Sequence, residues 1–194
     1  MNTPSFFEPI DYLAIGHITC DLTPTGERIG GSVSYAALTA HSLGLKVGIV
    51  TAWGEDGSLG PLSNIPIAGI VCEQSTTFSN HETTHDRIQT LHHIAPSIEY
   101  HHIPETWRNT PIVHLGPVAQ EISPKIIRNF PRSFVGVSAQ GWLRCWNDDG
   151  NIFASDWADA HDTLAQADAV IISIEDVGND FNRVETLSTY SQLL

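Results

Sequence analysis

Positive charge is scarce in this sequence, which holds 9 Lys and Arg against 22 Asp and Glu and has a net charge of −13. Binding to a nucleic-acid backbone depends on clustered Lys and Arg, so we expect no nucleic-acid partner. A small phosphorylated molecule needs only a local group of hydrogen-bond donors, and the charge does not exclude it.

Cysteines and long apolar runs are also scarce. Cys20, Cys72 and Cys145 are far apart and odd in number, which argues against a disulfide framework. No apolar run approaches the roughly 20 residues that cross a bilayer. The N-terminal stretch lacks the positive region and the apolar segment of a signal peptide. We therefore expect a soluble, cytoplasmic protein with no membrane partner.

Hydrophobic residues make up 41% of the 194 residues, which is enough for the core of one α/β domain. Residues 12–16 form a short apolar run and predict a strand. Residues 32–43 repeat apolar side chains at helical spacing, with Ser32 as N-cap and Gly44 as the stop signal. Residues 46–52 are apolar on both faces, as in a parallel strand covered on both sides. Together they predict a right-handed βαβ unit.

The remaining segments continue the α/β pattern around an inserted β element. Residues 21–30 read as a polar loop, and the alternation in residues 70–103 predicts antiparallel strands or a flap. Later segments predict strands at 111–115, 134–137 and 169–174, the last fully buried, and helices at 123–129, 157–167 and from 179 onward.

A carboxylate and a glycine pair suggest a ligand site at the start of this unit. Asp21 follows the first strand, at the edge where ligands of open α/β sheets bind. Gly30 and Gly31 precede a predicted helix, where backbone N–H groups can approach an oxygen-rich ligand. This combination suits sugar hydroxyls, although ordinary loop glycines and a solvated carboxylate would look the same. His17 and Cys20 flank Asp21, and they either shape the site or are buried structural residues.

The stretch from residue 15 to residue 56 resembles the N-terminal signature of ribokinase-like (PfkB) carbohydrate kinases. The matching residues are Asp21, Gly30, Gly31, Leu43, Gly44, Gly54, Glu55 and Asp56. Further stretches are similar to one branch of the family, namely Thr76, Thr77, Phe78, Asn80, Arg87, Gln89 and residues 116–118 and 140–144. The resemblance covers about residues 11–176. It implies a three-layer α/β/α fold with a mostly parallel sheet and a small β lid formed by residues 21–31 and 70–103.

The same resemblance implies roles for individual residues. Asp21 matches the carboxylate that binds sugar hydroxyls, and Gly31, next to Gly30, matches a backbone contact to the sugar. Ser32 and Tyr35 fall at positions of polar contacts, although Tyr35 stands where the family often has Asn. The complete family fold uses ATP and Mg²⁺ to phosphorylate a sugar or nucleoside, and its lid can also form a homodimer.

The segment at residues 173–176 is similar to the family's Asn-x-x-Glu element, which organises Mg²⁺ through water. Ser173 replaces the Asn and Asp176 replaces the Glu, and a carboxylate remains suited to Mg²⁺. The alternative is that Glu175 and Asp176 form the acidic first turn of a following helix.

The family's Gly-Ala-Gly-Asp motif, whose Asp is the catalytic base, has no match after Asp176. We therefore expect residues 1–194 to form a single, incomplete ribokinase-like domain, a truncated kinase that does not transfer phosphate. A non-catalytic sugar-binding relative is the alternative.

A less favoured hypothesis is a zinc-dependent hydrolase, because residues 81–85 fit the His-Glu-x-x-His pattern with His81, Glu82 and His85. That pattern requires a helix. The two central β-branched threonines and the alternating surroundings favour a strand instead.

Overall fold

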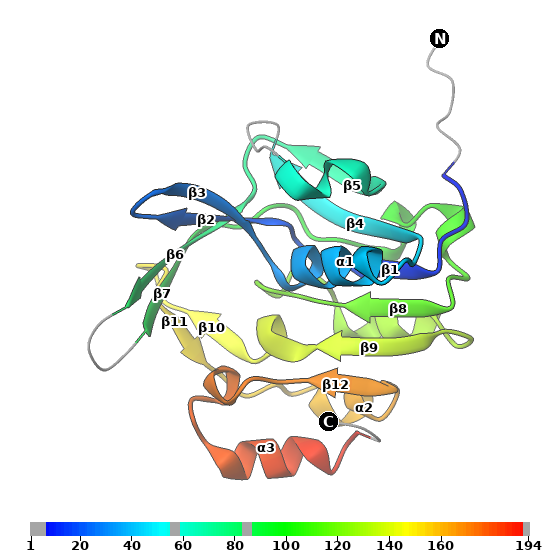
Figure 1. The fold of residues 1–194 in the computed structure, drawn as a ribbon. Coiled ribbons are helices and arrows are strands. Elements are labelled where there is room, and N and C mark those ends of the chain that lie inside the picture. The colour runs from blue at the N-terminus through cyan, green and yellow to red at the C-terminus, as the bar shows by residue number, and fades with distance from the viewer. Residues whose placement is uncertain (1–6, 55–58, 83–86, 192–194) are drawn as a thin grey trace.

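A six-stranded parallel sheet forms the centre of the molecule in the computed structural model, which describes residues 7–54, 59–82 and 87–191. The strand order is β12-β9-β8-β1-β4-β5, and every neighbouring pair is parallel (Figure 1). Its strands are β1 Tyr12–Ile15, β4 Val47–Gly54, β5 Ile67–Cys72, β8 Ile112–Leu115, β9 Phe134–Ser138 and β12 Ala169–Ile171.

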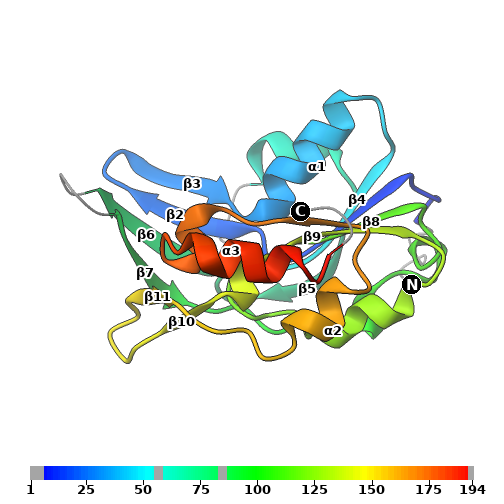
Figure 2. The same ribbon diagram turned by 90° about the horizontal axis from the view of Figure 1, so that it is seen from below.

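Helices lie on both sides of this main sheet (Figure 2). They are α1 Ser32–Ser42, α2 Ala160–Leu164, α3 Phe181–Ser188 and the 3₁₀ helix η4 Pro124–Asn129. The buried side chain of Ala37 on α1 packs in one cluster with Ala14 of β1 and Ile49 of β4. The predicted βαβ unit and the α/β fold with a mostly parallel sheet are therefore confirmed.

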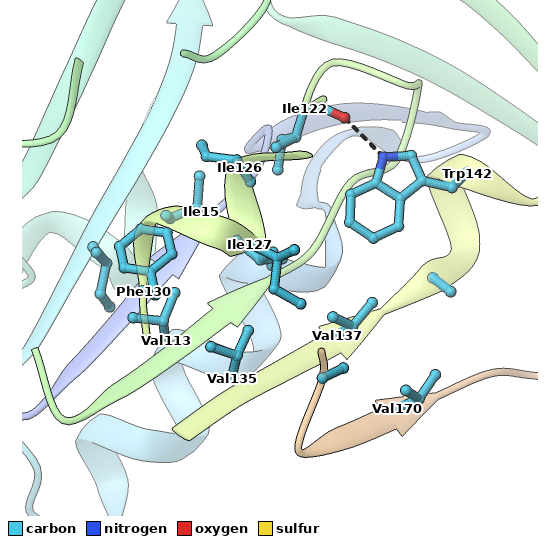
Figure 3. Close-up of a cluster of buried hydrophobic side chains, with 14 of the residues drawn as sticks. Ile15, Val113, Ile122, Ile126, Ile127, Phe130, Val135, Val137, Trp142 and Val170 are labelled. Atoms are coloured by element: carbon cyan, nitrogen blue, oxygen red, sulfur yellow. Dashed lines mark hydrogen bonds between the residues drawn. The ribbon is translucent and has the colours of Figure 1, made fainter. Parts of the chain in front are cut away.

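The larger core lies on the other face of the sheet, as Figure 3 shows. Val113 and Val135 of the sheet face Ile126 of η4 in this cluster. The indole N–H of Trp142 donates a hydrogen bond of 2.8 Å to the carbonyl of Ile122, so its one polar group is satisfied inside the core. Each large apolar side chain buried in this way contributes about 1.5–3 kcal/mol.

A second sheet, called the lid sheet below, projects from one end of the main sheet (Figure 1). Its order is β3-β2-β6-β7, with β2 Thr19–Thr23, β3 Gly26–Gly30, β6 Thr76–Glu82 and β7 Arg87–His93. A small hairpin, β10 Arg144–Trp146 and β11 Ile152–Ala154, meets it through a bridge between Thr90 and Asn151. The predicted β lid is present.

The lid differs from the predicted segments in two respects. The polar loop predicted at residues 21–30 is instead the β2–β3 hairpin, because β2 gains a parallel partner in the distant strand β6. Residues 70–72 belong to β5 of the main sheet, and the chain after β7 forms the 3₁₀ helices η2 Tyr100–His102 and η3 Glu105–Trp107.

Three further details also differ from prediction. Gly31, and not Ser32, is the N-cap of α1. The helix predicted at residues 157–167 shortens to α2. The prediction of a fully buried strand at residues 169–174 is wrong, because β12 is an edge strand with Ile171 61% exposed. Across the three described ranges, every helix is too short or too polar to span a bilayer.

Candidate functional site

Asp21 lies against Gly30 on the β2–β3 hairpin. The antiparallel register pairs Thr19 with Gly30 and Asp21 with Arg28, so these four residues share one face of the lid sheet. The hydroxyl of Thr19 donates a hydrogen bond of 2.9 Å to Oδ1 of Asp21. A Cβ atom at position 30 would collide with the Asp21 carboxylate, so the glycine is what allows this close approach.

Gly31 places the N-terminus of α1 directly beside this hairpin. Its φ of 87° lies in the region that favours glycine, and it lets the chain turn from β3 straight into the helix. Because Gly31 has no side chain, it does not cap the first N–H groups of α1. The partial positive charge of a helix N-terminus and the negative charge of Asp21 therefore lie close together.

Ser32 and Tyr35, the other two predicted contacts, have different surroundings. Ser32 is half-buried on the first turn of α1 and packs close to Gly116. A Cβ atom added at Gly116 would lie 3.2 Å from the Cβ of Ser32. The side chain of Tyr35 is 63% exposed. The structure thus brings Asp21, Gly30 and Gly31 together, adds Ser32 at the edge of the group, and leaves Tyr35 largely in solvent.

The face of the lid sheet that carries Asp21 is turned toward the main sheet. Phe78 lies beside Asp21 in the β2–β6 pairing, and Leu91 lies opposite Phe78. Both are buried in a cluster with Val118 and Ala119, which follow β8. Asp21 therefore lies on the face directed at the carboxyl end of β8, at an edge of the sheet where ligands bind.

A cavity of about 290 Å³ lies against the same hairpin. Cys20 and Ile29 line it, and these two residues pair with each other on the face opposite to Asp21. Trp53 and Ser75 also line it, as does Thr19, the hydrogen-bond partner of Asp21. The predicted sugar contacts Asp21, Gly30 and Gly31 therefore lie beside this cavity and are not part of its lining.

Asp176 lies in a buried polar cluster with Gln140 and Arg144. Oδ1 of Asp176 accepts a hydrogen bond of 3.2 Å from Nε2 of Gln140 and lies 3.9 Å from Nη2 of Arg144. The Arg144 guanidinium also donates to the carbonyl of Val118 and stacks 5.9 Å from the centre of the Phe78 ring. One buried cation thus connects the lid sheet with the turn after β12.

The predicted metal residues Ser173 and Asp176 form a helix cap. The turn η6, Ile174–Val177, begins with a capping box in which Oδ2 of Asp176 accepts from the Ser173 N–H at 2.9 Å, and the Ser173 hydroxyl accepts from the Glu175 N–H at 3.2 Å. Both carboxylate oxygens of Asp176 are thus engaged. This arrangement corresponds to the acidic-turn alternative and does not suit direct coordination of Mg²⁺.

The zinc-hydrolase pattern begins in a strand. His81 lies in the strand β6, and residues 83–86, including His85, lie outside the described residues. Among the residues that the structure does describe, no group of three or more His, Cys, Asp or Glu side chains could hold a metal ion.

Sequence reasoning missed Gln140, Arg144 and Glu121 as residues of this region. The signal for the first two was the stretch at residues 140–144, which carried only a resemblance and no role. Glu121 is 2% exposed, and its carboxylate accepts hydrogen bonds from the N–H groups of His17, Val118 and Ala119. Nothing in its local sequence distinguishes it from a surface glutamate.

No protein-family model matches the sequence, and no curated protein does. The structure is similar to solved structures of kinases. A pyrophosphate-dependent kinase in the ribokinase family, complexed with a pyrophosphate analog and myo-inositol, matches 93% of this chain and 70% of its own at 19% identity and a TM-score of 0.75.

Two further solved structures are similar over most of the chain. The fructokinase of Halothermothrix orenii is matched over 91% of this chain and 76% of its own, at 16% identity and a TM-score of 0.60. The ribokinase of Arabidopsis thaliana, complexed with ribose and ATP, is matched over 92% and 69%, at 12% identity and a TM-score of 0.58. These likenesses establish the fold: the chain has the ribokinase-like α/β fold with its β lid.

Proposed function

We propose that this chain forms the acceptor-binding part and the lid of a ribokinase-type kinase, and that it holds a sugar or another small polyol. The observation that carries the proposal is the placement of Asp21 against Gly30, beside the N-terminus of α1 and on the lid face turned toward the main sheet. A carboxylate accepts from hydroxyl groups and the helix N–H groups donate to their oxygens. The pair therefore suits adjacent hydroxyls of one ring.

The structural neighbours suggest which acceptors to test first. One neighbour is a kinase complexed with myo-inositol and another is a ribokinase complexed with ribose, so these two polyols are the first to test. Fructose is the third polyol to test, because another neighbour is a fructokinase. A nucleoside, which also presents ribose hydroxyls, belongs in the same panel.

Phosphoryl transfer needs donors that stabilise the transferring group and a base for the attacking hydroxyl. The sequence has no Gly-Ala-Gly-Asp stretch to supply them. We therefore propose that residues 1–194 alone bind the acceptor without phosphorylating it. In the complete fold the donor would be ATP with Mg²⁺. Ser173 and Asp176 would then act on the ion through water, because the Asp176 oxygens already accept two hydrogen bonds.

We also propose a homodimer through the lid. The face of the lid sheet opposite to Asp21 carries apolar side chains in solvent, with Leu22 36% and Ile88 47% exposed. A second copy of the same face would cover them.

Calorimetric titration with the polyol panel tests the acceptor site. We expect one of the polyols to bind, and Asp21→Asn to weaken it about tenfold or more, because a hydrogen bond to a charged group contributes about 1.5–3 kcal/mol. Glu27→Gln is the matched control, since Glu27 lies on the same hairpin with its side chain on the other face. No binding at millimolar concentration, or equal losses in both variants, contradicts the proposal.

A further inference from the structure

Four chain segments connect the main sheet with the lid sheet. Residues 16–18 lead from β1 to β2, Gly31 leads from β3 to α1, residues 73–75 lead from β5 to β6, and residues 94–96 leave β7. The orientation of the lid sheet depends on how these segments are held, beside the packing of Phe78 and Leu91 on Val118 and Ala119. His17 lies in the first segment, and its residue is 0% exposed.

The backbone of the first segment contacts Gly31 and two side chains outside the lid sheet. The carbonyl oxygen of His17 lies so close to Gly31 that a Cβ there would collide with it. The His17 N–H donates a hydrogen bond of 3.0 Å to Oε1 of the buried Glu121. The next N–H, that of Ile18, donates to Oγ1 of Thr51 on β4 at 2.8 Å. Side chains thus satisfy the N–H groups that have no strand partner where the chain changes sheets.

The imidazole of His17 contacts the segment that leaves β7 and the first residue of β6. Nε2 lies 3.0 Å from the carbonyl oxygen of Pro96, which can only accept, so this nitrogen carries the proton. In the neutral ring Nδ1 is then an acceptor, and it lies 2.7 Å from Oγ1 of Thr76, the first residue of β6. Oγ1 of Thr76 in turn accepts from the Ala95 N–H at 2.9 Å. One continuous chain of hydrogen bonds thus runs from the Ala95 N–H through Thr76 and the His17 ring to the Pro96 carbonyl.

We propose that His17 is a positioning residue that fixes the angle of the lid sheet, since it lies in one connecting segment, contacts Gly31 and Pro96 in two others, and bonds Thr76, the residue that follows the remaining one. It holds the hairpin that carries Asp21 against the N-terminus of α1. The consequence for acceptor affinity rests on the proposed function, whereas the consequence for the lid sheet does not.

Thr76→Val tests this role, because valine keeps the shape of threonine and removes the hydroxyl that joins His17 to β6. We expect amide hydrogen exchange in β2, β3, β6 and β7 to accelerate about tenfold, the change that about 1.4 kcal/mol produces. Exchange in β1, β4 and β8 stays at the wild-type rate. Thr76→Ser, which retains the hydroxyl, restores protection of the lid sheet.

Ser79→Ala is the matched control. It removes a hydrogen bond of similar length, 2.8 Å, between Ser79 and His92, but both residues lie within the lid sheet. We expect it to leave exchange at the sheet junction unchanged. If Thr76→Val does not fold, His17→Asn is measured in its place.

Uniform acceleration across both sheets, or none in the lid sheet, would show that His17 is an ordinary buried residue. The proposed polyol site is read separately by titration. If lid exchange accelerates but no polyol binds, the role of His17 is supported and the acceptor site is rejected. If lid exchange is unchanged but a polyol binds, the acceptor site is supported and the role of His17 is rejected.

Discussion

Oδ1 of Asp176 lies 3.9 Å from Nη2 of Arg144, and the two side chains are 7% and 9% exposed. The same carboxylate caps η6, and the same guanidinium stacks on Phe78 of the lid sheet. A buried ion pair of this kind is costly to break, because removing one partner leaves the other charge in a medium that solvates it poorly. The turn after β12 is thereby fixed relative to the lid.

Asp176→Asn should therefore destabilise the protein by about 3 kcal/mol, read as the free energy of unfolding in urea. Asp156→Asn is the control, because Asp156 also pairs with an arginine, Arg183, but its side chain is fully in solvent. An exposed pair contributes at most about 1 kcal/mol. Equal losses in the two variants would mean that burial of the Asp176 pair has no energetic effect.

Gly31→Ala should destabilise the protein more than Gly44→Ala. Both glycines have a φ close to 90°, a left-handed backbone conformation that destabilises an alanine by about 1 kcal/mol or more. A Cβ at Gly44 meets open space, whereas a Cβ at Gly31 collides with the His17 carbonyl. Thermal melts of the two variants therefore separate the clash from the backbone strain. A similar loss in both would argue against tight packing at the junction of the two sheets.

Stability should fall as the pH decreases from about 6.5 to about 4. His114 is buried between Tyr12 and Ser138, with hydrogen bonds of 2.7 and 2.8 Å, and burial lowers its pKa to about 4. The unfolded chain binds a proton at this histidine below pH 6.5 and the folded protein does not, so unfolding is favoured there by up to about 3 kcal/mol.

Burial also raises the pKa of Tyr12 to about 12, so stability should decline above pH 10, where the phenol ionises in the unfolded chain but not in the folded protein.

The acid side is tested with His114→Gln, whose free energy of unfolding should change less with pH between pH 4 and 7 than that of the wild type. His161→Gln, at an exposed histidine, serves as control and should retain the wild-type slope. Identical slopes in all three proteins would rule out His114 as the cause.

The isolated chain should associate or precipitate through the face of β9 and β12. Phe134 is 50% and Ile171 61% exposed, and the register places both on the face opposite to the buried Val135 and Val170. Among the described residues, α1 covers this face only over β1 and β4. Exposed apolar sheet surface and an open strand edge favour association.

Lysine at both positions, Phe134→Lys with Ile171→Lys, should raise the monomer fraction in sedimentation experiments. Phe181→Lys is the control, because Phe181 is 73% exposed but belongs to α3 and not to the sheet. A wild-type chain that is monomeric and melts cooperatively would contradict the prediction.

The segments that the sequence predicts well are those whose neighbours are close along the chain. The apolar run of β1, the helical spacing of α1 and the apolar strand β4 pack on one another, so local periodicity was sufficient. The β2–β3 hairpin was missed because its polar residues become a strand only when the distant β6 pairs with β2. A non-local partner of this kind leaves no local signal.

The residues of the candidate site also fall into those that local sequence indicates and those that it does not. Asp21 and the two glycines could be predicted, because the resemblance to a family assigns their positions and the backbone constraints select glycine. Arg144 and Glu121 act through burial and through contacts made across the fold. Their surroundings, and not their sequence neighbours, determine what they do. For Asp176 the acidic first turn was predicted as an alternative, but the capping box, whose Ser-x-x-Asp spacing is visible in the sequence, was not identified.

The central claim is that a polyol binds between Asp21 and the N-terminus of α1, and mapping backbone amide shifts by NMR tests it most directly. The wild type is titrated with the polyol of the panel that binds most tightly. The account predicts that the largest shifts fall on Asp21 and residues 30–34, and that Asp21→Asn abolishes them. Shifts centred instead on Trp53 and Ser75, at the cavity on the other face of the hairpin, would contradict it.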